Sequence, residues 1–311
     1  MANTANLTRK SIKRRSVRSY LISWFLRRNF KPKLLSPDFD APRFRRSLDR
    51  DMGRNPVATE VEIKAFEQDG IRGEWNIPAG KKSSQVILYC HGGGYLFGSP
   101  LAYRSFTTRL AKQSGASVFV LDYRLAPEHP FPAAADDALA AYHYLLETRD
   151  PHTIVLAGDS AGAGLCLSLL AQIKEAGLPM PAAAMLLSPY ADLSTTGVSL
   201  DSNSQSCAMF SGDSIRRAAA TYLAGADALD PRASPLFADY TGFPPLLIYV
   251  SDSEVLRDDG IRVAEKAAVA GVTTELQIWR GQPHVWPLFV PRLPEAVTVL
   301  DELVAFCKAA G

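Results

Sequence analysis

The sequence predicts an α/β fold built on a mostly parallel sheet of eight strands that is flanked by helices. Two observations predict this class. Short apolar runs rich in β-branched residues alternate with longer segments of helical periodicity, and 47% of the 311 residues are hydrophobic, which is enough for a large core. Disordered, collagenous and disulfide-rich classes are excluded, because the charges nearly balance, the glycines have no period, and the chain has only four cysteines.

Strands and helices are expected to alternate along most of the chain. The first two strands follow one another with no helix between them, as in a hairpin, whereas the later strands alternate with helices, which favours parallel pairing. Strands are expected at 60–66, 70–76, 85–90, 116–122, 153–157, 183–187, 246–250 and 274–278. Helices are expected at 102–114, 133–148, 160–176, 256–270 and 294–308.

The N-terminal segment differs from the rest of the chain in charge. Residues 1–50 contain 14 Lys and Arg against three acids, a net charge of +11, whereas the remaining 261 residues contain 20 basic and 29 acidic residues, a net charge of −9. The apolar run at 20–26 is too short for a secretion signal or a membrane span, and no small-residue cleavage site follows it. We therefore expect a cytoplasmic protein.

One face of a helix is expected within this basic segment. Val17, Tyr20, Leu21 and Trp24 recur at the spacing of a single helix face, with arginines around them. The favoured interpretation is that this face packs on the body of the protein. Peripheral membrane contact is a second and less favoured interpretation, and nucleic-acid binding is not expected.

The cysteines indicate a reducing compartment. They are widely spaced, form no C-x-x-C pair and match no Cys/His metal pattern, so we expect small buried side chains and no metal site. They are Cys90, Cys166, Cys207 and Cys307.

A second segment, residues 194–238, also falls outside the alternation and contains its own helical piece at 213–225. It follows the strand at 183–187, so it leaves the sheet at the carboxyl end of the strands. Ligands bind beyond this edge in open α/β sheets. The segment is therefore placed to cover a site there.

The strongest chemical signal is the pentapeptide Gly158-Asp-Ser160-Ala-Gly162, between a predicted strand and a long apolar helix. The small residues permit a tight turn that projects a serine hydroxyl at the edge of the sheet. A phosphate loop is disfavoured, because the Lys of that motif is absent. Ser160 is the expected nucleophile.

A glycine-rich loop, His91-Gly92-Gly93-Gly94-Tyr95, follows the strand at 85–90. Consecutive glycines expose backbone N–H groups that can point at a developing oxyanion. In lipases and esterases such a loop lies upstream of the nucleophile. We expect the N–H groups of Gly92, Gly93 and Ala161 to form the oxyanion hole.

The base and the acid are expected downstream of the nucleophile, in the order Ser, acid, His of α/β hydrolases. Of the five histidines only His284 follows Ser160, in a Gly/Pro loop after the last strand. The loop after the strand at 246–250 offers several acids. Two of them begin the next helix, where acids favour the helix dipole, and spacing alone does not separate the other two. The four are Asp252, Glu254, Asp258 and Asp259.

These motifs together resemble the bacterial hormone-sensitive lipase family of esterases, over roughly residues 57–311. The resemblance rests on HGGGY, on Asp122-Tyr-Arg-Leu-Ala-Pro-Glu128, on GDSAG, and on the acidic and histidine loops. It implies the α/β-hydrolase fold with a helical cap, and aligning Leu256-Arg-Asp-Asp259 on the family's acid loop puts Glu254 at the catalytic position. It also implies dimers formed through the edge strand near the C-terminus.

The resemblance divides the chain into a catalytic unit, residues 56–193 and 239–311, and a helical cap, residues 1–55 and 194–238. Expected pocket residues flank the motifs or lie in the cap. Asp159 and Glu128 are interpreted as loop anchors, not as catalytic acids. The expected pocket residues are Tyr95, Phe97, Tyr190, Met209, Phe210 and Trp286.

The predicted activity is hydrolysis of short-chain acyl esters by a Ser160–His284–Glu254 triad, with no cofactor. An amidase, peptidase or lactonase on the same fold shares all these residues. A non-catalytic receptor for small ligands is the alternative from a different class, and it is disfavoured because His284 is present. The expected partner is a small ester, and a homodimer is a further expectation.

Overall fold

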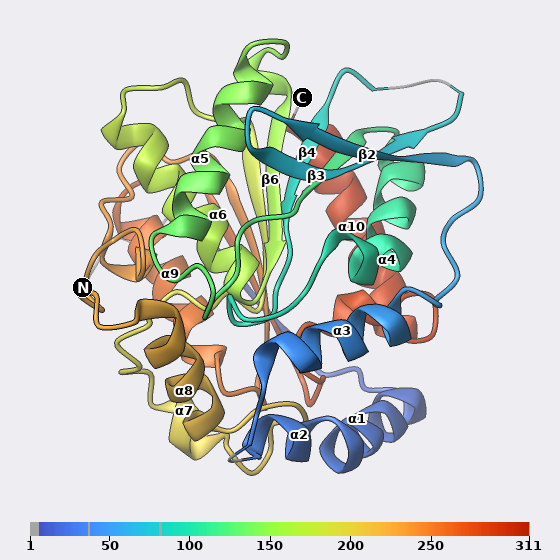
Figure 1. Ribbon diagram of the computed structural model, residues 1–311, viewed down its shortest axis with the longest axis vertical. Helices are drawn as coiled ribbons and strands as arrows, with labels where there is room; N and C mark the ends of the chain where they lie inside the picture. Colours follow the sequence, from blue (N-terminus) through green and yellow to red (C-terminus); the bar gives the residue numbers. More distant parts are fainter. Residues whose placement is uncertain (1–5, 37, 81–82, 311) are drawn as a thin grey trace.

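A computed structural model describes residues 6–36, 38–80 and 83–310 and shows one twisted sheet with helices on both faces (Figure 1). Within the described residues the sheet has nine strands in the order β1-β9-β8-β7-β6-β4-β5-β3-β2. All neighbours pair in parallel except β2 with β3 and β3 with β5. The strands are β1 Leu7–Ile12, β2 Val61–Gln68, β3 Ile71–Pro78, β4 Val86–Cys90, β5 Ser117–Leu121, β6 Ile154–Asp159, β7 Ala183–Leu187, β8 Leu246–Ser251 and β9 Thr274–Trp279.

Each of the eight predicted strands is present as β2 to β9, with ends that differ by at most two residues. The predicted helices are present as well. The longer helices are α1 Val17–Asn29, α3 Ala41–Met52, α4 Pro100–Ser114, α5 Ala133–Leu146, α6 Ala161–Glu175, α8 Gly212–Leu223, α9 Arg257–Val269 and α10 Pro294–Ala309. Short helices are α2 Lys31–Leu35, α7 Ser199–Ser202, η1 Pro151–Thr153, η2 Pro235–Phe237 and η3 Trp286–Phe289.

The core lies on both faces of the central strands. β4, β6, β7 and β8 are buried along their whole length, which is why they appear in the sequence as continuous apolar runs. One face is covered by α5, α6 and α9, and the other by α4 and α10. All four cysteines are buried free thiols within this packing.

The ninth strand corrects the sequence analysis. The basic N-terminal segment was expected to be wholly helical cap, and the strand at 274–278 was the last strand predicted. Instead β1 pairs with β9 in parallel, from Leu7 opposite Thr274 to Ile12 opposite Trp279. Among the described residues, the edge of the sheet on this side is therefore the basic strand β1 and not β9. The pattern gave no strand signal, because only the two end residues of β1 are apolar.

Five helices gather beyond the carboxyl ends of the strands, at the bottom of Figure 1, and we call them the cap helices: α1, α2, α3, α7 and α8. They come from the N-terminal segment and from the insertion between β7 and β8. The two groups are joined by hydrogen bonds, including Lys31 Nζ to the Cys207 carbonyl at 2.9 Å and Arg217 Nη1 to the Ser36 carbonyl at 2.9 Å. Residues 1–5 and 37 of the expected cap, and residues 81, 82 and 311 of the expected catalytic unit, lie outside the described residues.

Helix α1 is present, but it is turned the other way from the favoured interpretation. The face expected to pack on the body is exposed, with Val17 at 75% and Trp24 at 59% of their maximal accessible area. Ser19, Ser23 and Leu26 face inward instead. Across the described residues, no helix is long and apolar enough to cross a membrane.

Candidate active site

Ser160 lies on a sharp turn between β6 and α6. Its backbone has φ 52°, a left-handed conformation that non-glycine residues adopt at a cost in free energy. Hydrogen bonds hold the strained residue from both sides: its N–H donates to the Leu187 carbonyl at 2.8 Å, and its carbonyl accepts the Tyr190 N–H at 3.0 Å. A side chain at Gly162 would collide with the Cys90 carbonyl, so this glycine lets the turn sit against β4.

The glycine-rich loop after β4 is anchored by Asp159, the residue before Ser160. The Asp159 carboxylate accepts hydrogen bonds from the Tyr89 hydroxyl at 2.8 Å, the Tyr103 hydroxyl at 3.0 Å and the Gly92 N–H at 3.0 Å. Burial raises the pKa of Asp159 to about 6, and these three hydrogen bonds oppose that rise. Asp159 is thus a buried anchor that ties the loop to the turn that carries Ser160.

This anchoring corrects one expected oxyanion donor. The Gly92 N–H already donates to Asp159 and to the Tyr103 hydroxyl, so it does not point at a substrate. The N–H groups of Gly93, Gly94 and Ala161 make no hydrogen bond within the described part of the chain. Gly93 has φ 122° and packs against the Phe97 carbonyl, which no residue with a Cβ could do. Gly94 lines the same cavity as Ser160.

His284 and Glu254 are brought together from the loops after β9 and β8. Both side chains are almost completely buried, and His284 Nδ1 is hydrogen-bonded to Glu254 Oε2. Because a carboxylate can only accept, Nδ1 carries the proton and Nε2 is left as an acceptor. Nε2 is buried and has no partner among the described residues. The Phe210 ring meets the imidazole edge-on, with 5.1 Å between ring centroids.

Three further groups fix Glu254, and sequence reasoning did not find them. Its Oε1 accepts the Ser188 hydroxyl at 3.0 Å and the Ser251 N–H at 2.6 Å, and Asn203 Nδ2 donates to its backbone carbonyl at 2.9 Å. Ser188 and Asn203 follow β7, far from the acid in sequence, and no motif marks them.

The other acids of this loop are occupied elsewhere. Asp252 is exposed and accepts the Gly281 N–H at 2.7 Å. Asp258 accepts the Ser199 N–H, and the buried Asp259 accepts the N–H groups of Ala191 and Asp192. Glu254 is therefore the one acid of the four that is hydrogen-bonded to His284 within the described residues.

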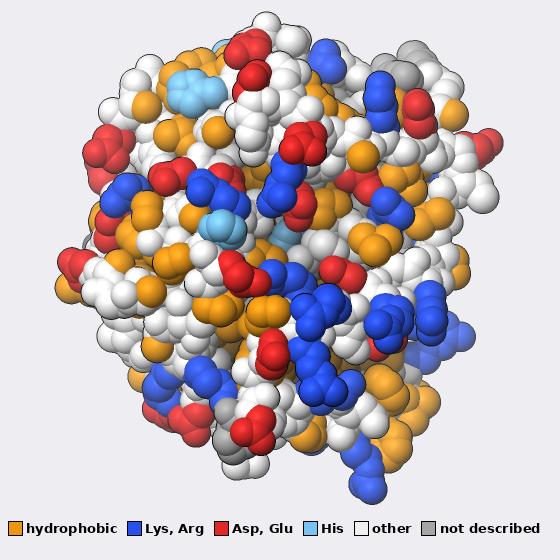
Figure 2. Space-filling model, viewed as in Figure 1, with side chains coloured by type: hydrophobic (Ala, Val, Ile, Leu, Met, Phe, Trp, Pro, Cys, Tyr) orange, Lys and Arg blue, Asp and Glu red, His pale blue; other side chains and the backbone are white. Residues whose placement is uncertain are grey.

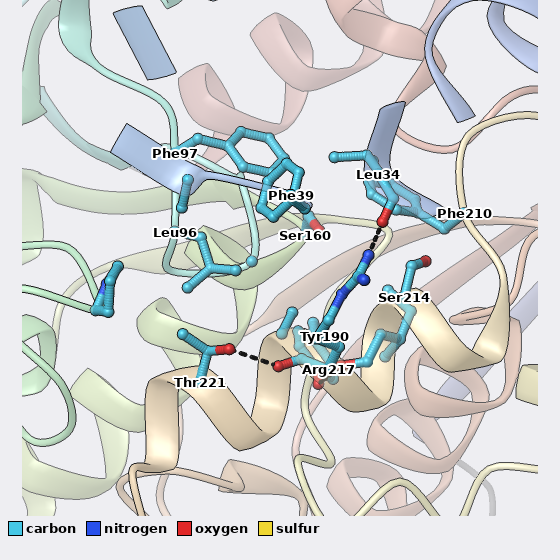
Figure 3. Close-up of a pocket in the computed structure, with 15 residues that line it drawn as sticks. Leu34, Phe39, Leu96, Phe97, Ser160, Tyr190, Phe210, Ser214, Arg217 and Thr221 are labelled. Carbon is cyan, nitrogen blue, oxygen red and sulfur yellow. Dashed lines mark hydrogen bonds between the residues drawn. The ribbon is translucent and has the colours of Figure 1, made fainter. Parts of the chain in front are cut away.

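A narrow cavity of about 140 Å³ opens beside Ser160. In Figure 3 the rings of Phe39 and Phe97 bound one side and α8 bounds the other, with Arg217 bridging from α8 to the Leu34 carbonyl. The wall is mostly apolar. It is formed by the N-terminal segment, by the catalytic unit and by the insertion between β7 and β8. The lining residues are Leu34, Phe39, Ala41, Gly94, Leu96, Phe97, Pro127, Ser160, Tyr190, Phe210, Ser214, Ile215, Arg217, Ala218 and Thr221.

Three of the six expected pocket residues, Phe97, Tyr190 and Phe210, line this cavity. The other three lie in the packing around it. Tyr95 stacks on Tyr222 with 3.9 Å between ring centroids, Met209 packs with Leu26 of α1, and Trp286 is fully buried against Trp279. Aromatic residues beside a motif are as suited to the core as to a pocket, and sequence cannot tell the two apart.

The cap contributes lining residues that the sequence analysis missed. Ser214, Ile215, Ala218 and Thr221 fall on one face of α8. The spacing of these four residues predicts that they share one face of a helix. It does not predict whether that face lines a cavity or packs in the core. Leu34 and Phe39 lie in a segment without a regular pattern.

Comparisons with known proteins agree with this arrangement. A model of an α/β-hydrolase fold family matches residues 87–288. The chain is 43% identical over 238 residues to an acetyl-hydrolase of Streptomyces hygroscopicus, covering 76% of this chain and 79% of the relative. It is 36% identical over 283 residues to an esterase of Acinetobacter venetianus, covering 90% of each.

Solved structures extend the similarity to the whole fold. The structure of EstE5 soaked with ethyl alcohol has a TM-score of 0.90 at 37% identity, covering 95% of this chain and 99% of that one. An esterase from the bacterial hormone-sensitive lipase family has a TM-score of 0.89 at 36% identity, covering 96% and 99%. The chain therefore belongs to the α/β-hydrolase fold family and, within it, to the carboxylesterases of the hormone-sensitive lipase family.

Proposed function

We propose that the chain hydrolyses esters of short acyl groups with Ser160 as nucleophile, His284 as base and Glu254 as the acid that orients His284. One observation carries the assignment. The Nδ1 side of His284 is hydrogen-bonded to Glu254, while its Nε2 is a buried acceptor with no partner among the described residues, beside the cavity wall formed by Phe210. A base in this state is ready to accept a proton from a serine hydroxyl.

In the proposed mechanism His284 Nε2 takes the Ser160 proton as Ser160 Oγ attacks the ester carbonyl carbon. The resulting oxyanion accepts hydrogen bonds from the N–H groups of Gly93, Gly94 and Ala161, with Gly94 taking the place first expected for Gly92. The protonated His284 then gives its proton to the departing alcohol. His284 finally takes a proton from a water molecule that attacks the acyl carbon, the bond from that carbon to Ser160 Oγ breaks, and His284 returns the proton to Ser160 as the acid leaves.

The size of the cavity supports short acyl groups. At about 140 Å³ it lies below the roughly 300–1,000 Å³ of typical ligand pockets. Phe39 and Phe97 bound it on one side and Arg217 of α8 lies on the other, and one relative is named an acetyl-hydrolase. We propose that the cap helices act as the lid that sets this limit, since α2, the segment after it and α8 all contribute to the wall.

The test compares nitrophenyl esters of increasing acyl length with three variants. We expect the highest kcat/KM for the shortest acyl groups, and Ser160→Ala should lose activity by about 10⁴-fold or more. Glu254→Gln should lower kcat by about 10⁴-fold, because it favours the wrong tautomer of His284. Asp252→Asn is the matched control and should keep wild-type kinetics.

Other outcomes would reject parts of the proposal. If Asp252→Asn loses activity while Glu254→Gln keeps it, the acid is wrongly assigned. Equal rates on short and long acyl chains would reject the lid. Nitroanilides of the same acyl groups separate an esterase from an amidase, and we expect the esters to react far faster.

A further inference from the structure

Helix α1 exposes most of its large apolar side chains, unlike a helix that packs its apolar residues on a core. Its inward face carries Ser19 and Ser23, which are 0% and 4% exposed. Its outward face carries large apolar side chains at the i, i+3, i+4, i+7, i+8 spacing of one stripe. These are Val17 at 75%, Tyr20 at 55%, Leu21 at 62%, Trp24 at 59% and Phe25 at 56% exposure, and we call them the α1 patch.

Specific polar contacts hold the helix in this orientation. Ser19 Oγ donates to Gln282 Oε1 at 2.9 Å, and Arg15 donates to the hydroxyls of Ser19 and Ser23 at 3.4 Å each. At the start of the helix, Ser16 Oγ donates to Glu295 Oε2 at 2.9 Å. Turning the α1 patch inward would leave these buried polar groups without partners, which opposes such a rotation.

The α1 patch is surrounded by positive charge. Residues 1–37 contain ten Lys and Arg and no acid. Arg18, Arg27 and Arg28 lie on α1 itself and are exposed. At the lower right of Figure 2, over α1, hydrophobic side chains lie beside Lys and Arg side chains. Exposed large apolar side chains beside exposed arginines can enter the headgroup region of a membrane and pair with its anionic lipids.

We propose that α1 docks the protein onto anionic lipid surfaces, with the α1 patch in the headgroup region and the arginines on the lipid phosphates. Charge complementarity selects this occupant. A second copy would bring two basic helices face to face, and their repulsion opposes that contact. Each basic residue close to an anionic surface contributes to binding, and the apolar stripe adds to it.

Docking in this way orients the catalytic unit. α1 leads directly into α2 and Phe39, and Leu34 and Phe39 line the cavity. On the inward side Leu26 packs with Met209, and Phe30 meets Phe210, the aromatic neighbour of His284, at 6.2 Å between ring centroids. The lipid surface thus lies on the cap side of the molecule, next to helices that bound the cavity.

The test measures co-sedimentation of the full chain with vesicles of phosphatidylcholine alone and of phosphatidylcholine mixed with phosphatidylglycerol. We expect binding only to the mixed vesicles, and weaker binding as salt increases. Of the four tryptophans Trp279 and Trp286 are buried and Trp75 is half-buried on β3, so a blue shift of emission that is lost in a Trp24→Phe variant reports on α1.

Two α1 variants and two controls make the assignment specific. Leu21→Ser with Trp24→Ser should weaken binding by about tenfold or more, and Arg18→Gln with Arg28→Gln should weaken it by about fivefold per arginine. Leu229→Ser and Arg149→Gln alter exposed side chains outside the N-terminal segment and should bind like wild type. All variants should retain hydrolysis of a water-soluble ester, which shows that they are folded.

Three results would overturn the proposal. The first is that the wild type does not bind mixed vesicles. The second is that the α1 variants bind them as well as the wild type does. The third is that light scattering without lipid shows a dimer, which Leu21→Ser with Trp24→Ser dissociates. The last result would assign the α1 patch to a second copy of the chain.

Discussion

Ser188 is a fully buried residue that connects the base and the acid loops. Its hydroxyl donates to Glu254 Oε1 at 3.0 Å and accepts the Val285 N–H, next to His284, at 3.3 Å. The residue has φ 50°, so the chain bears backbone strain in order to place this hydroxyl. We interpret Ser188 as a positioning residue that acts through Glu254.

Ser188→Ala should lower kcat by about tenfold with little change in KM, because a hydrogen bond to a charged carboxylate is lost behind the base. The acid limb of the pH–rate profile should also move, since the environment of Glu254 changes. Kinetics across pH provide the measurement.

The matched control for Ser188 is Ser168→Ala, a buried serine whose hydroxyl donates to the Arg232 carbonyl. It should destabilise the fold without altering the pH profile. If the two variants give the same profile, Ser188 has only a structural role.

At this scale, sequence predicted the residues that motifs mark. Ser160 and His284 follow from the strand–turn–helix context and from chain order. The choice between Asp252 and Glu254 could not be made from spacing, because it depends on which carboxylate is taken by the Gly281 N–H. Likewise, sequence does not separate Gly92 from Gly94 as an oxyanion donor. The difference is that the Gly92 N–H already donates to the Asp159 carboxylate.

Strand β1 is the one strand of the described sheet that the sequence did not predict, and it replaces β9 at the edge of the sheet. It covers β9, and its central residues, Thr8 to Ser11, are exposed. Lys10 pairs with Glu275 at 2.6 Å on the surface, a contact of small energetic value. The main role of β1 is to satisfy the backbone of β9 and to replace an apolar edge by a basic one, which discourages edge-to-edge association.

Removing residues 1–13 should therefore expose β9 and promote self-association. We expect concentration-dependent oligomers in light scattering and a lower Tm. Arg9→Ala is the control, because it keeps the strand and loses only an exposed side chain, and it should behave as wild type. A truncated chain that stays monomeric with an unchanged Tm would contradict this role for β1.

The elements that sequence missed share a physical cause. Alternation and continuous apolar runs mark strands that bury one face or both, as β2 to β9 do to different degrees. β1 buries almost nothing, and α1 buries its polar face because Gln282 and Glu295 supply partners from the far end of the chain. The spacing of residues within α1 cannot predict hydrogen-bond partners that lie more than 260 residues away in the sequence.

For the molecule as a whole, stability depends on buried groups whose pKa is displaced. Burial lowers the pKa of His91 to about 4. Burial raises the pKa of Asp159 to about 6 and, with the charge of Asp192, that of Asp259 to about 8. His91 therefore favours folding at higher pH, and its contribution is lost as pH falls from the unfolded value of about 6.5 toward 4. The two acids act in the opposite sense, since each penalises folding as pH rises through its raised pKa.

His91→Asn isolates the first contribution, because the amide can still donate to the Gly92 carbonyl as His91 Nδ1 does at 2.9 Å. Between about pH 7 and about pH 5, the wild type should lose about 2 kcal/mol more free energy of unfolding than the variant. Urea unfolding at the two pH values measures the difference. Equal losses would show that His91 does not titrate in this window.

The pairing of β1 with β9 also has a consequence for the order in which the chain can fold during synthesis. Strand β1 is synthesised well before its partner at residues 274–279, so it stays unpaired while the strands between them are made. A segment that must wait benefits from being basic and well hydrated, with few apolar residues to aggregate. We therefore expect the pairing of β1 with β9 to be among the last steps that complete the sheet.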